Sequence, residues 1–122
     1  MYEASIVVRF SAAHFLREYP GNCANLHGHN WKVVVTVKAD ELDELGFVID
    51  FRELKKQTNK VIDELDHSLI NDHPYFKEIN PSSENIARWV FNKLQPLIDN
   101  KCCSLHSVEI GETETSRIVY YG

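Results

Sequence analysis

Apolar and polar residues alternate along the N-terminal part of the chain, which indicates strands. Between Tyr2 and Phe15, the apolar Ile6, Val8 and Phe10 alternate with polar positions, as in a strand with one buried face. A second strand is expected from about 27 to 39, because WKVVVTV is rich in β-branched residues. The intervening EYPGNCAN combines Pro, Gly and Asn and predicts a loop.

The apolar positions change to helical spacing in the middle of the chain. Asp50 is expected to cap a first helix, with the carboxylate of Glu53 three residues later. The residues that follow at helical spacing form an apolar stripe: Leu54, Thr58, Val61, Ile62, Leu65 and Leu69. A second helix is expected in the segment that starts NPSSEN, capped by Ser82 or Ser83, with Glu84 near its N-terminal dipole.

Two further strands, at about 104–111 and 116–121, close the chain. The order strand, strand, helix, helix, strand, strand predicts an α+β fold in which two helices cover one face of a four-stranded antiparallel sheet. The sequence contains no repeat, low-complexity tract or linker, so residues 1–122 are expected to form one domain. The edges of so small a sheet need cover, which favours oligomerisation through the sheet.

Composition and charge narrow the classes of function. Apolar residues make up 43% of the chain and charged residues 25%, with a formal net charge of -5. The overall field therefore does not attract nucleic acid or anionic membrane. A signal-peptide pattern and the roughly 20 consecutive apolar residues of a membrane span are both missing, and a cytoplasmic protein is expected. Three cysteines, two of them adjacent, favour reduced thiols over disulfides.

Three histidines share the apolar faces of the first two strands and form a candidate metal site. His27 and His29 project from one face of a strand, on the side of Trp31, and His14 has the parity of Phe10. A charged imidazolium would be poorly solvated on such faces. Three neutral nitrogens with an open fourth position are typical of catalytic zinc. The alternative is ordinary histidines near strand ends, hydrogen-bonded or half exposed.

Cys23 precedes His27 by four residues and is expected to lie next to the metal. A neighbouring cation or histidine lowers the pKa of a thiol and favours the thiolate. Such a thiolate could be a fourth zinc ligand, a nucleophile or a base. We favour the base, because three histidines already suffice for the metal. The alternative is a small buried apolar residue without a chemical role.

Two adjacent pairs of residues also carry candidate chemistry. In Asp66–His67 the carboxylate could orient the imidazole for proton transfer, or it could cap or pair with the end of the first helix. Glu112–Thr113 ends the third strand, and a carboxylate there could accept paired N–H donors from a guanidine-like ring edge. Turns also collect Glu and Thr without such a role.

Together these segments resemble the 6-pyruvoyl-tetrahydropterin synthase superfamily over essentially the whole chain. The similarity is carried by FSAAH, CANLHGHNW, FVIDF, LDH, NPSSENIA and GET. The Cys-x3-His-Gly-His spacing is similar to that of the bacterial and archaeal 6-carboxy-tetrahydropterin synthases of queuosine precursor biosynthesis. Mammalian-type pyruvoyl-forming members have a longer gap, and a third subgroup carries Glu in place of Cys.

The resemblance implies a T-fold assembled around a β-barrel, commonly a homohexamer of two trimers with sites between subunits. It implies a zinc-dependent carbon–oxygen lyase that converts 7,8-dihydroneopterin triphosphate to 6-carboxy-5,6,7,8-tetrahydropterin, acetaldehyde and triphosphate. A 6-pyruvoyl-tetrahydropterin synthase is the alternative within the superfamily. A zinc- or pterin-binding protein without turnover is the alternative from another class.

The resemblance also implies a role for each matching residue. The zinc ligands are matched by His14, His27 and His29. Cys23 matches the proton-abstracting thiol, and Asp66 with His67 matches a second acid–base relay. Glu112 matches the carboxylate that anchors the amino-pyrimidine edge of the pterin. Three residues are expected to line that pocket: Thr113, Ser83 and Glu84.

Two positions beside Glu112 depart from the pattern of the superfamily. Arg117 stands where relatives often have a small residue, and Gly111 stands where a larger one is common. The details of substrate fit are therefore expected to differ. Three cations are candidates for the triphosphate by charge alone: Arg9, Arg17 and Lys32.

Overall fold

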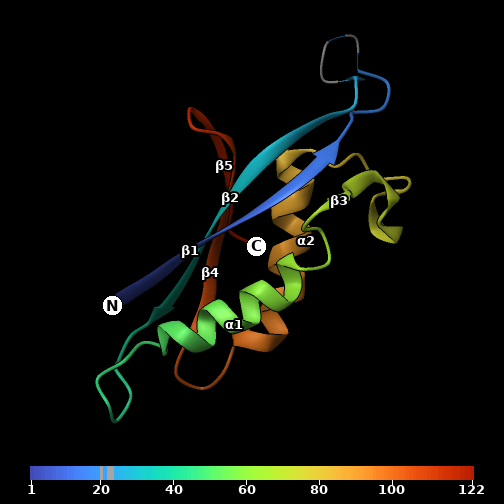
Figure 1. The fold of residues 1–122 in the computed structure, drawn as a ribbon. Coiled ribbons are helices and arrows are strands. Elements are labelled where there is room, and N and C mark those ends of the chain that lie inside the picture. Colours follow the sequence, from blue (N-terminus) through green and yellow to red (C-terminus); the bar gives the residue numbers. More distant parts are fainter. Residues whose placement is uncertain (20, 22–23) are drawn as a thin grey trace.

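The computed structural model describes residues 1–19, 21 and 24–122 and contains a five-stranded sheet of order β3-β1-β2-β4-β5 (Figure 1). The strands are β1 (Tyr2–His14), β2 (His27–Ala39), β3 (Ser68–Leu69), β4 (Ser104–Thr113) and β5 (Ser116–Tyr120). The helices are α1 (Phe51–Ile62), α2 (Ser83–Ile98) and the short 3-10 helices η2 (Ile70–Asp72) and η3 (Pro74–Phe76).

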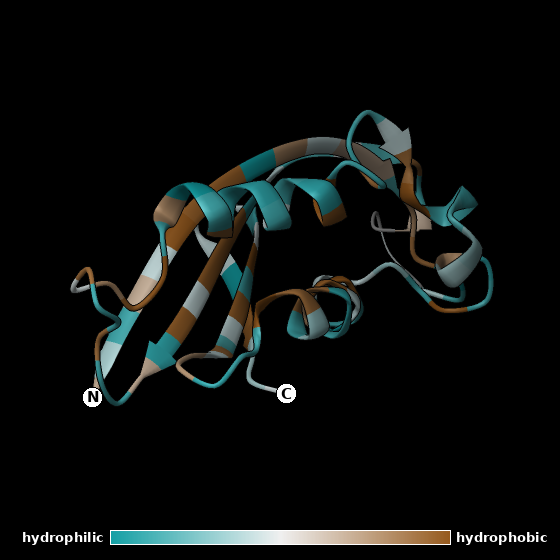
Figure 2. Cartoon of the chain, turned by 90° about the horizontal axis from the view of Figure 1, so that it is seen from below, coloured by the Kyte–Doolittle hydropathy of each residue, from teal (hydrophilic) through white to brown (hydrophobic). Residues whose placement is uncertain are grey.

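The first two strands form a long antiparallel hairpin that fixes the position of the histidines. Its register runs without a break from Tyr2 opposite Ala39 to His14 opposite His27. Every second residue of β2 from Trp31 onward is buried, and Figure 2 shows apolar and polar bands along the strands. The parity inferred from the sequence is therefore the parity of the folded sheet.

The two α-helices pack against each other and against the buried face of the sheet (Figure 1). Leu54 of α1 and Val90 of α2 are fully buried there with Val33 and Val35 of β2. The other face of β1 is largely exposed. The sheet thus has one apolar face under the helices and one polar face, as the α+β prediction requires.

The helix caps expected from the sequence are confirmed. The Asp50 carboxylate accepts a hydrogen bond from the backbone N–H of Arg52 at 2.8 Å, and the Ser82 hydroxyl accepts one from the N–H of Asn85 at 3.2 Å. Each cap satisfies a backbone donor that the helix itself leaves unpaired. Ser82, rather than Ser83, is the cap of α2.

The prediction of four strands was wrong by one, because β3 was missed. Residues Ser68 and Leu69 pair in parallel with Ala12 and Ala13 of β1. The apolar residues keep helical spacing as far as Leu69, which predicts a longer helix, but α1 ends at Ile62. The chain then turns, and the N–H of His67 donates to the carbonyl of Ser11 at 2.6 Å. Pairing with β1 thus replaces the last helical turn.

Among the described residues, no helix is long and apolar enough to cross a membrane.

Candidate metal centre and its surroundings

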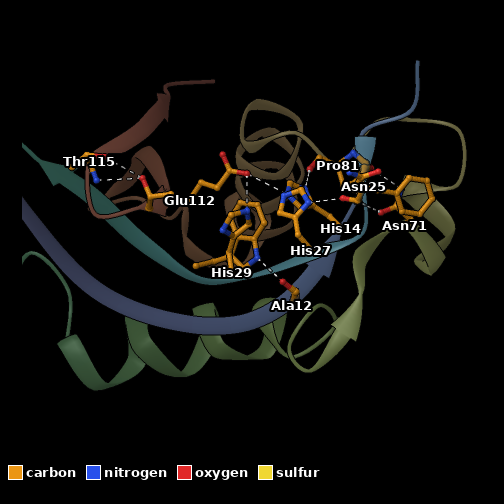
Figure 3. Close-up of polar contacts among 12 residues, drawn as sticks. Ala12, His14, Asn25, His27, His29, Asn71, Pro81, Glu112 and Thr115 are labelled. Atoms are coloured by element: carbon orange, nitrogen blue, oxygen red, sulfur yellow. Dashed lines mark hydrogen bonds and ion pairs between the residues drawn. The ribbon is translucent and has the colours of Figure 1, made fainter. Parts of the chain in front are cut away.

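Three histidine side chains meet at one end of the β1–β2 hairpin (Figure 3). His14 and His27 are cross-strand partners, and His29 follows two residues later on the same face of β2. Nε2 of His14 lies 3.0 Å from Nε2 of His27. The His29 ring centroid is 4.8 Å from that of His27 and 5.3 Å from that of His14. The hairpin register thus brings together the three histidines that the sequence singled out.

Backbone carbonyls decide which ring nitrogens of two histidines carry protons. Nδ1 of His14 lies 2.8 Å from the carbonyl oxygen of Pro81, and Nδ1 of His27 lies 2.6 Å from that of Asn25. A carbonyl only accepts, so both Nδ1 atoms are donors. In neutral rings both Nε2 atoms then present lone pairs to each other across 3.0 Å. A shared cation between them removes this repulsion, so the donor set fits a metal.

Burial favours the neutral, metal-binding form of the cluster. Desolvation lowers the pKa of His14 below its ordinary value of 6.5, with the Pro81 carbonyl acting in the opposite direction. Desolvation also lowers the pKa of His29, against the attraction of Glu112. Both imidazoles are therefore neutral at pH 7, the state that ligates metal.

Glu112 of β4 supplies a fourth ligand atom to the same cluster (Figure 3). Its Oε1 lies 3.2 Å from Nε2 of His14 and 3.1 Å from Nε2 of His29. Despite this proximity, the buried Nε2 of His29 forms no hydrogen bond of acceptable geometry within the described chain. The four ligand atoms all lie within 4.8 Å of one another. Three nitrogens and one oxygen at these distances form a group that can hold a metal ion.

The sequence analysis missed the contact between Glu112 and the histidines. A signal for it existed, since Glu112 has the parity of Val108 and Ile110, which are buried on the helix-covered face of β4. That is the face from which the histidines project. If the alternation of side chains had been followed on the third long strand as well as on the first two, it would have predicted that the Glu112 carboxylate lies with the metal ligands.

The Asp66–His67 pair is bonded within a single chain. Oδ2 of Asp66 lies 3.0 Å from Nδ1 of His67, and Oδ1 accepts a hydrogen bond from the N–H of Ser11 at 2.9 Å. These contacts, the Ser11 N–H first, lower the pKa of the Asp66 carboxyl below its ordinary value of 3.8. The carboxylate thus holds an exposed imidazole through Nδ1. The alternative of a helix-end contact is wrong, since α1 ends at Ile62.

Two hollows on the surface bring the pair close to other candidate residues. A shallow one of about 520 Å³ is lined by both His67 and His29. A larger one of about 840 Å³ is lined by Asp66 and His67 together with Thr113. The larger hollow is also lined by two of the cations proposed for triphosphate and by both positions that depart from the superfamily pattern: Arg9, Lys32, Gly111 and Arg117.

The remaining candidate residues fall in different places. Ser83 and Glu84 form the first turn of α2, next to the Pro81 carbonyl that holds His14. Arg17 instead donates to the Ile79 carbonyl at 3.4 Å. Cys23 lies outside the described residues, so its predicted place beside the metal stays a prediction.

Arg117 and Gly111, the two positions that depart from the superfamily pattern, each lie close to a residue of the sheet. Arg117 lies 3.5 Å from the carboxylate of Glu109. A Cβ added at Gly111 would lie 3.4 Å from Cβ of Lys32, at the limit of ordinary van der Waals contact.

Fold and site define a small α+β protein with a candidate metal centre built on a β-hairpin. The chain belongs to the 6-pyruvoyl tetrahydropterin synthase family, whose family model matches residues 3–122. It is 37% identical to a 6-carboxy-5,6,7,8-tetrahydropterin synthase of Bacillus subtilis, covering 98% of this chain and 84% of the relative. Identity is 39% to the protein of that name in Synechocystis sp., over 92% and 87% of the two chains.

Relatives with a second name are also similar. The human 6-pyruvoyl tetrahydrobiopterin synthase is 36% identical, covering 83% of this chain and 70% of the relative. The structure of Caenorhabditis elegans 6-pyruvoyl tetrahydropterin synthase superposes with a TM-score of 0.89 at 31% identity, over 99% and 95% of the two chains. The predicted family and T-fold are therefore confirmed.

Proposed function

We propose that this protein is a zinc-dependent carbon–oxygen lyase. Its substrates are 7,8-dihydroneopterin triphosphate and water, and its products are 6-carboxy-5,6,7,8-tetrahydropterin, acetaldehyde and triphosphate. Triphosphate leaves by cleavage of a carbon–oxygen bond, acetaldehyde leaves by cleavage of the C1′–C2′ bond of the side chain, and water supplies the second oxygen of the carboxyl group. The observation that carries the proposal is the convergence of three Nε2 atoms in the histidine cluster, two of them fixed as acceptors by backbone carbonyls. The choice of product is supported by the relatives named 6-carboxy-5,6,7,8-tetrahydropterin synthase and by the Cys-x3-His spacing.

His14, His27 and His29 would hold the zinc ion, since their donor set and burial fit it. A zinc ion held there would supply Lewis-acid chemistry, which can acidify a C–H next to a hydroxyl of the substrate side chain. The protein's contribution is to keep the imidazoles neutral and oriented. Pro81 and Asn25 do this through their carbonyl oxygens.

Two residues are proposed to move protons on either side of the reacting carbon. Cys23, as thiolate, is the first base. His67 is the second, and Asp66 holds the proton of its Nδ1 so that Nε2 can accept and return one. Glu112 is proposed to anchor the amino-pyrimidine edge, and Thr113, Ser83 and Glu84 are proposed to line the same pterin pocket. The reduced pterin ring takes up electrons internally, so the proposed reaction uses no redox cofactor.

The test is to incubate the purified protein with 7,8-dihydroneopterin triphosphate and to measure acetaldehyde and the pterin product. We expect acetaldehyde in step with 6-carboxy-5,6,7,8-tetrahydropterin. A pyruvoyl product without acetaldehyde would instead identify a 6-pyruvoyl-tetrahydropterin synthase, the name that the human relative carries. Tight zinc and pterin binding without any turnover would identify a non-catalytic protein.

Cys23→Ser provides the matched control for this assay. The variant should keep its zinc and lose activity by orders of magnitude, because the hydroxyl is a far weaker base than a thiolate. Loss of the metal from Cys23→Ser would make Cys23 a ligand rather than a base.

A further inference from the structure

Glu112 lies at an irregularity in the pairing of β4 with β5, on the same face of β4 as Val108 and Ile110. Gly111 pairs with Arg117 and Thr113 pairs with Ser116, so Glu112 is the extra residue between them. A bulge of this kind bends the strand and increases its local twist, so it adjusts the direction of a side chain that already faces the histidines. Here the carboxylate reaches over to the histidines of β1 and β2 (Figure 3).

The distances around the Glu112 oxygen are those of a coordination shell. Metal–ligand distances of about 2.0–2.1 Å in a tetrahedron place neighbouring ligand atoms about 3.3 Å apart. Oε1 of Glu112 lies 3.2 Å from His14 Nε2 and 3.1 Å from His29 Nε2, and the two nitrogens of His14 and His27 are 3.0 Å apart. Three of the distances among the four ligand atoms thus match those of neighbouring ligands, and all four atoms lie within 4.8 Å of one another.

We infer that Glu112 is a fourth metal ligand that closes the centre when no pterin is bound and leaves the metal when a pterin binds. A carboxylate that accepts two parallel N–H bonds from an amino-pyrimidine edge uses both oxygens. Such an edge approaches the carboxylate from the open side of the cluster and would draw Oε1 outward from its position between His14 and His29. The Glu112 side chain is 30% exposed whereas that of His14 is 2% exposed, so the carboxylate lies at the open side of the cluster and can swing outward.

This exchange deepens the proposed function, since it rests on that proposal for the identity of the displacing ligand. A closed shell of three nitrogens and one oxygen offers no position for substrate. Engagement of the pterin edge by Glu112 vacates the fourth position at the moment when the substrate's side chain arrives. One residue therefore couples recognition of the ring to access to the metal.

The experiment uses the full-length protein reconstituted with Co²⁺, whose visible absorption reports coordination. Glu112→Gln removes the charged ligand with little change of shape. Its matched control is Glu109→Gln on the same strand, where the carboxylate pairs with Arg117 at 3.5 Å away from the cluster. Zn²⁺ affinity is measured by chelator competition, and folding by circular dichroism.

We expect Glu112→Gln to lower Zn²⁺ affinity by at least about tenfold, since even outer-shell partners of metal ligands contribute 10–100-fold. It should also change the cobalt spectrum, whereas Glu109→Gln should match the wild type in both. A folded Glu112→Gln protein with wild-type affinity and spectrum would overturn the assignment of Glu112 as a ligand.

Displacement is tested with neopterin, a pterin without the triphosphate. Adding it to the wild-type cobalt protein should shift the spectrum toward that of Glu112→Gln. An unchanged spectrum at neopterin concentrations far above those of the protein would overturn the displacement. These measurements do not depend on turnover. If they give the expected results but the protein releases no acetaldehyde, the proposed reaction is wrong while the assignment of Glu112 as a fourth ligand still holds.

Discussion

Pro81 and Asn25 contribute no side-chain chemistry to the site, yet their carbonyl oxygens fix the tautomers of His14 and His27. Asp66 does the same for His67 with a carboxylate. In each case one ring nitrogen is held as a donor so that the other remains free for a metal or a proton. At the scale of residues, the site therefore depends on the oxygen atoms that hydrogen-bond the imidazoles as much as on the imidazoles themselves.

The Asp66 carboxylate gives a prediction about acid stability. Its pKa in the folded protein is lowered from 3.8, so the folded state binds fewer protons than the unfolded state just below that pH. The stabilisation is complete above pH 3.8 and is lost as the pH falls through the folded value. Asp66→Asn should therefore be less stable than the wild type at pH 7, and the difference should shrink below about pH 3.8.

Urea unfolding between pH 7 and pH 3 measures this difference. Asp72→Asn, a change at an exposed aspartate of η2, is the control and should follow the wild type. A stability loss in Asp66→Asn that is the same at every pH would contradict the assigned hydrogen bonds.

Only those parts of the candidate site that follow from the alternation of side chains along the strands were predictable from the sequence. Parity placed His14, His27 and His29 on one face, and the hairpin register confirms that they meet. It did not reveal the carbonyl of Pro81, because 67 residues separate it from His14 and no side-chain pattern marks a carbonyl. The proton-transfer role of the predicted Cys23 stays a prediction.

At the scale of elements, the long strands were predictable and the short segments between them were not. Residues 27–39 are a strand in the sequence analysis and in the structure, because thirteen residues display a clear period. β3 has two residues and displays none. Asn71 and Asn80 each form two hydrogen bonds with the backbone after β1, at Phe15 and Arg17. Such amide contacts, which fix the entry to the loop, have no periodic signature.

The start of α2 gives a prediction that separates stability from metal binding. Ser82→Ala and Asp50→Ala each remove an N-cap and should each cost about 1 kcal/mol of unfolding free energy. Only Ser82 is adjacent to Pro81, whose carbonyl holds His14. Ser82→Ala should therefore also weaken Zn²⁺ binding several-fold, whereas Asp50→Ala should not.

Denaturant unfolding of the two variants and chelator competition measure the two effects. Equal loss of zinc affinity in both would mean that the metal centre responds to global stability. No loss in either would show that the Pro81 carbonyl does not depend on the cap.

At the scale of the whole molecule, the helices cover one face of the sheet and leave the other face and the β5 edge to solvent (Figure 1). Val119 of β5 and the following Tyr121 are 37% and 64% exposed. The polar face carries the large hollow that Asp66 and His67 line. The layered arrangement followed from the order of elements in the sequence. A single chain carries no pattern that specifies an oligomer number, and the assembly with sites between subunits is an expectation that rests on the resemblance to the superfamily.

Shared sites predict complementation between inactive subunits. Cys23→Ser and His67→Ala proteins should each be inactive, and mixed oligomers of the two should regain activity, because some sites then receive both wild-type residues. Mixed oligomers can be isolated with two affinity tags before the acetaldehyde assay. Oligomers that contain both variants and stay inactive would place Cys23 and His67 of one site in the same chain.

Metal analysis of His27→Ala tests whether the β1–β2 hairpin holds a metal centre. Wild-type protein purified with Zn²⁺ in the medium should contain about one zinc ion per chain. His27→Ala should contain almost none, because His27 supplies one of the three converging Nε2 atoms. His106→Ala is the control, since His106 lies 3.6 Å from Glu3 and outside the cluster, and it should keep its zinc. Full zinc content in folded His27→Ala protein would contradict the account.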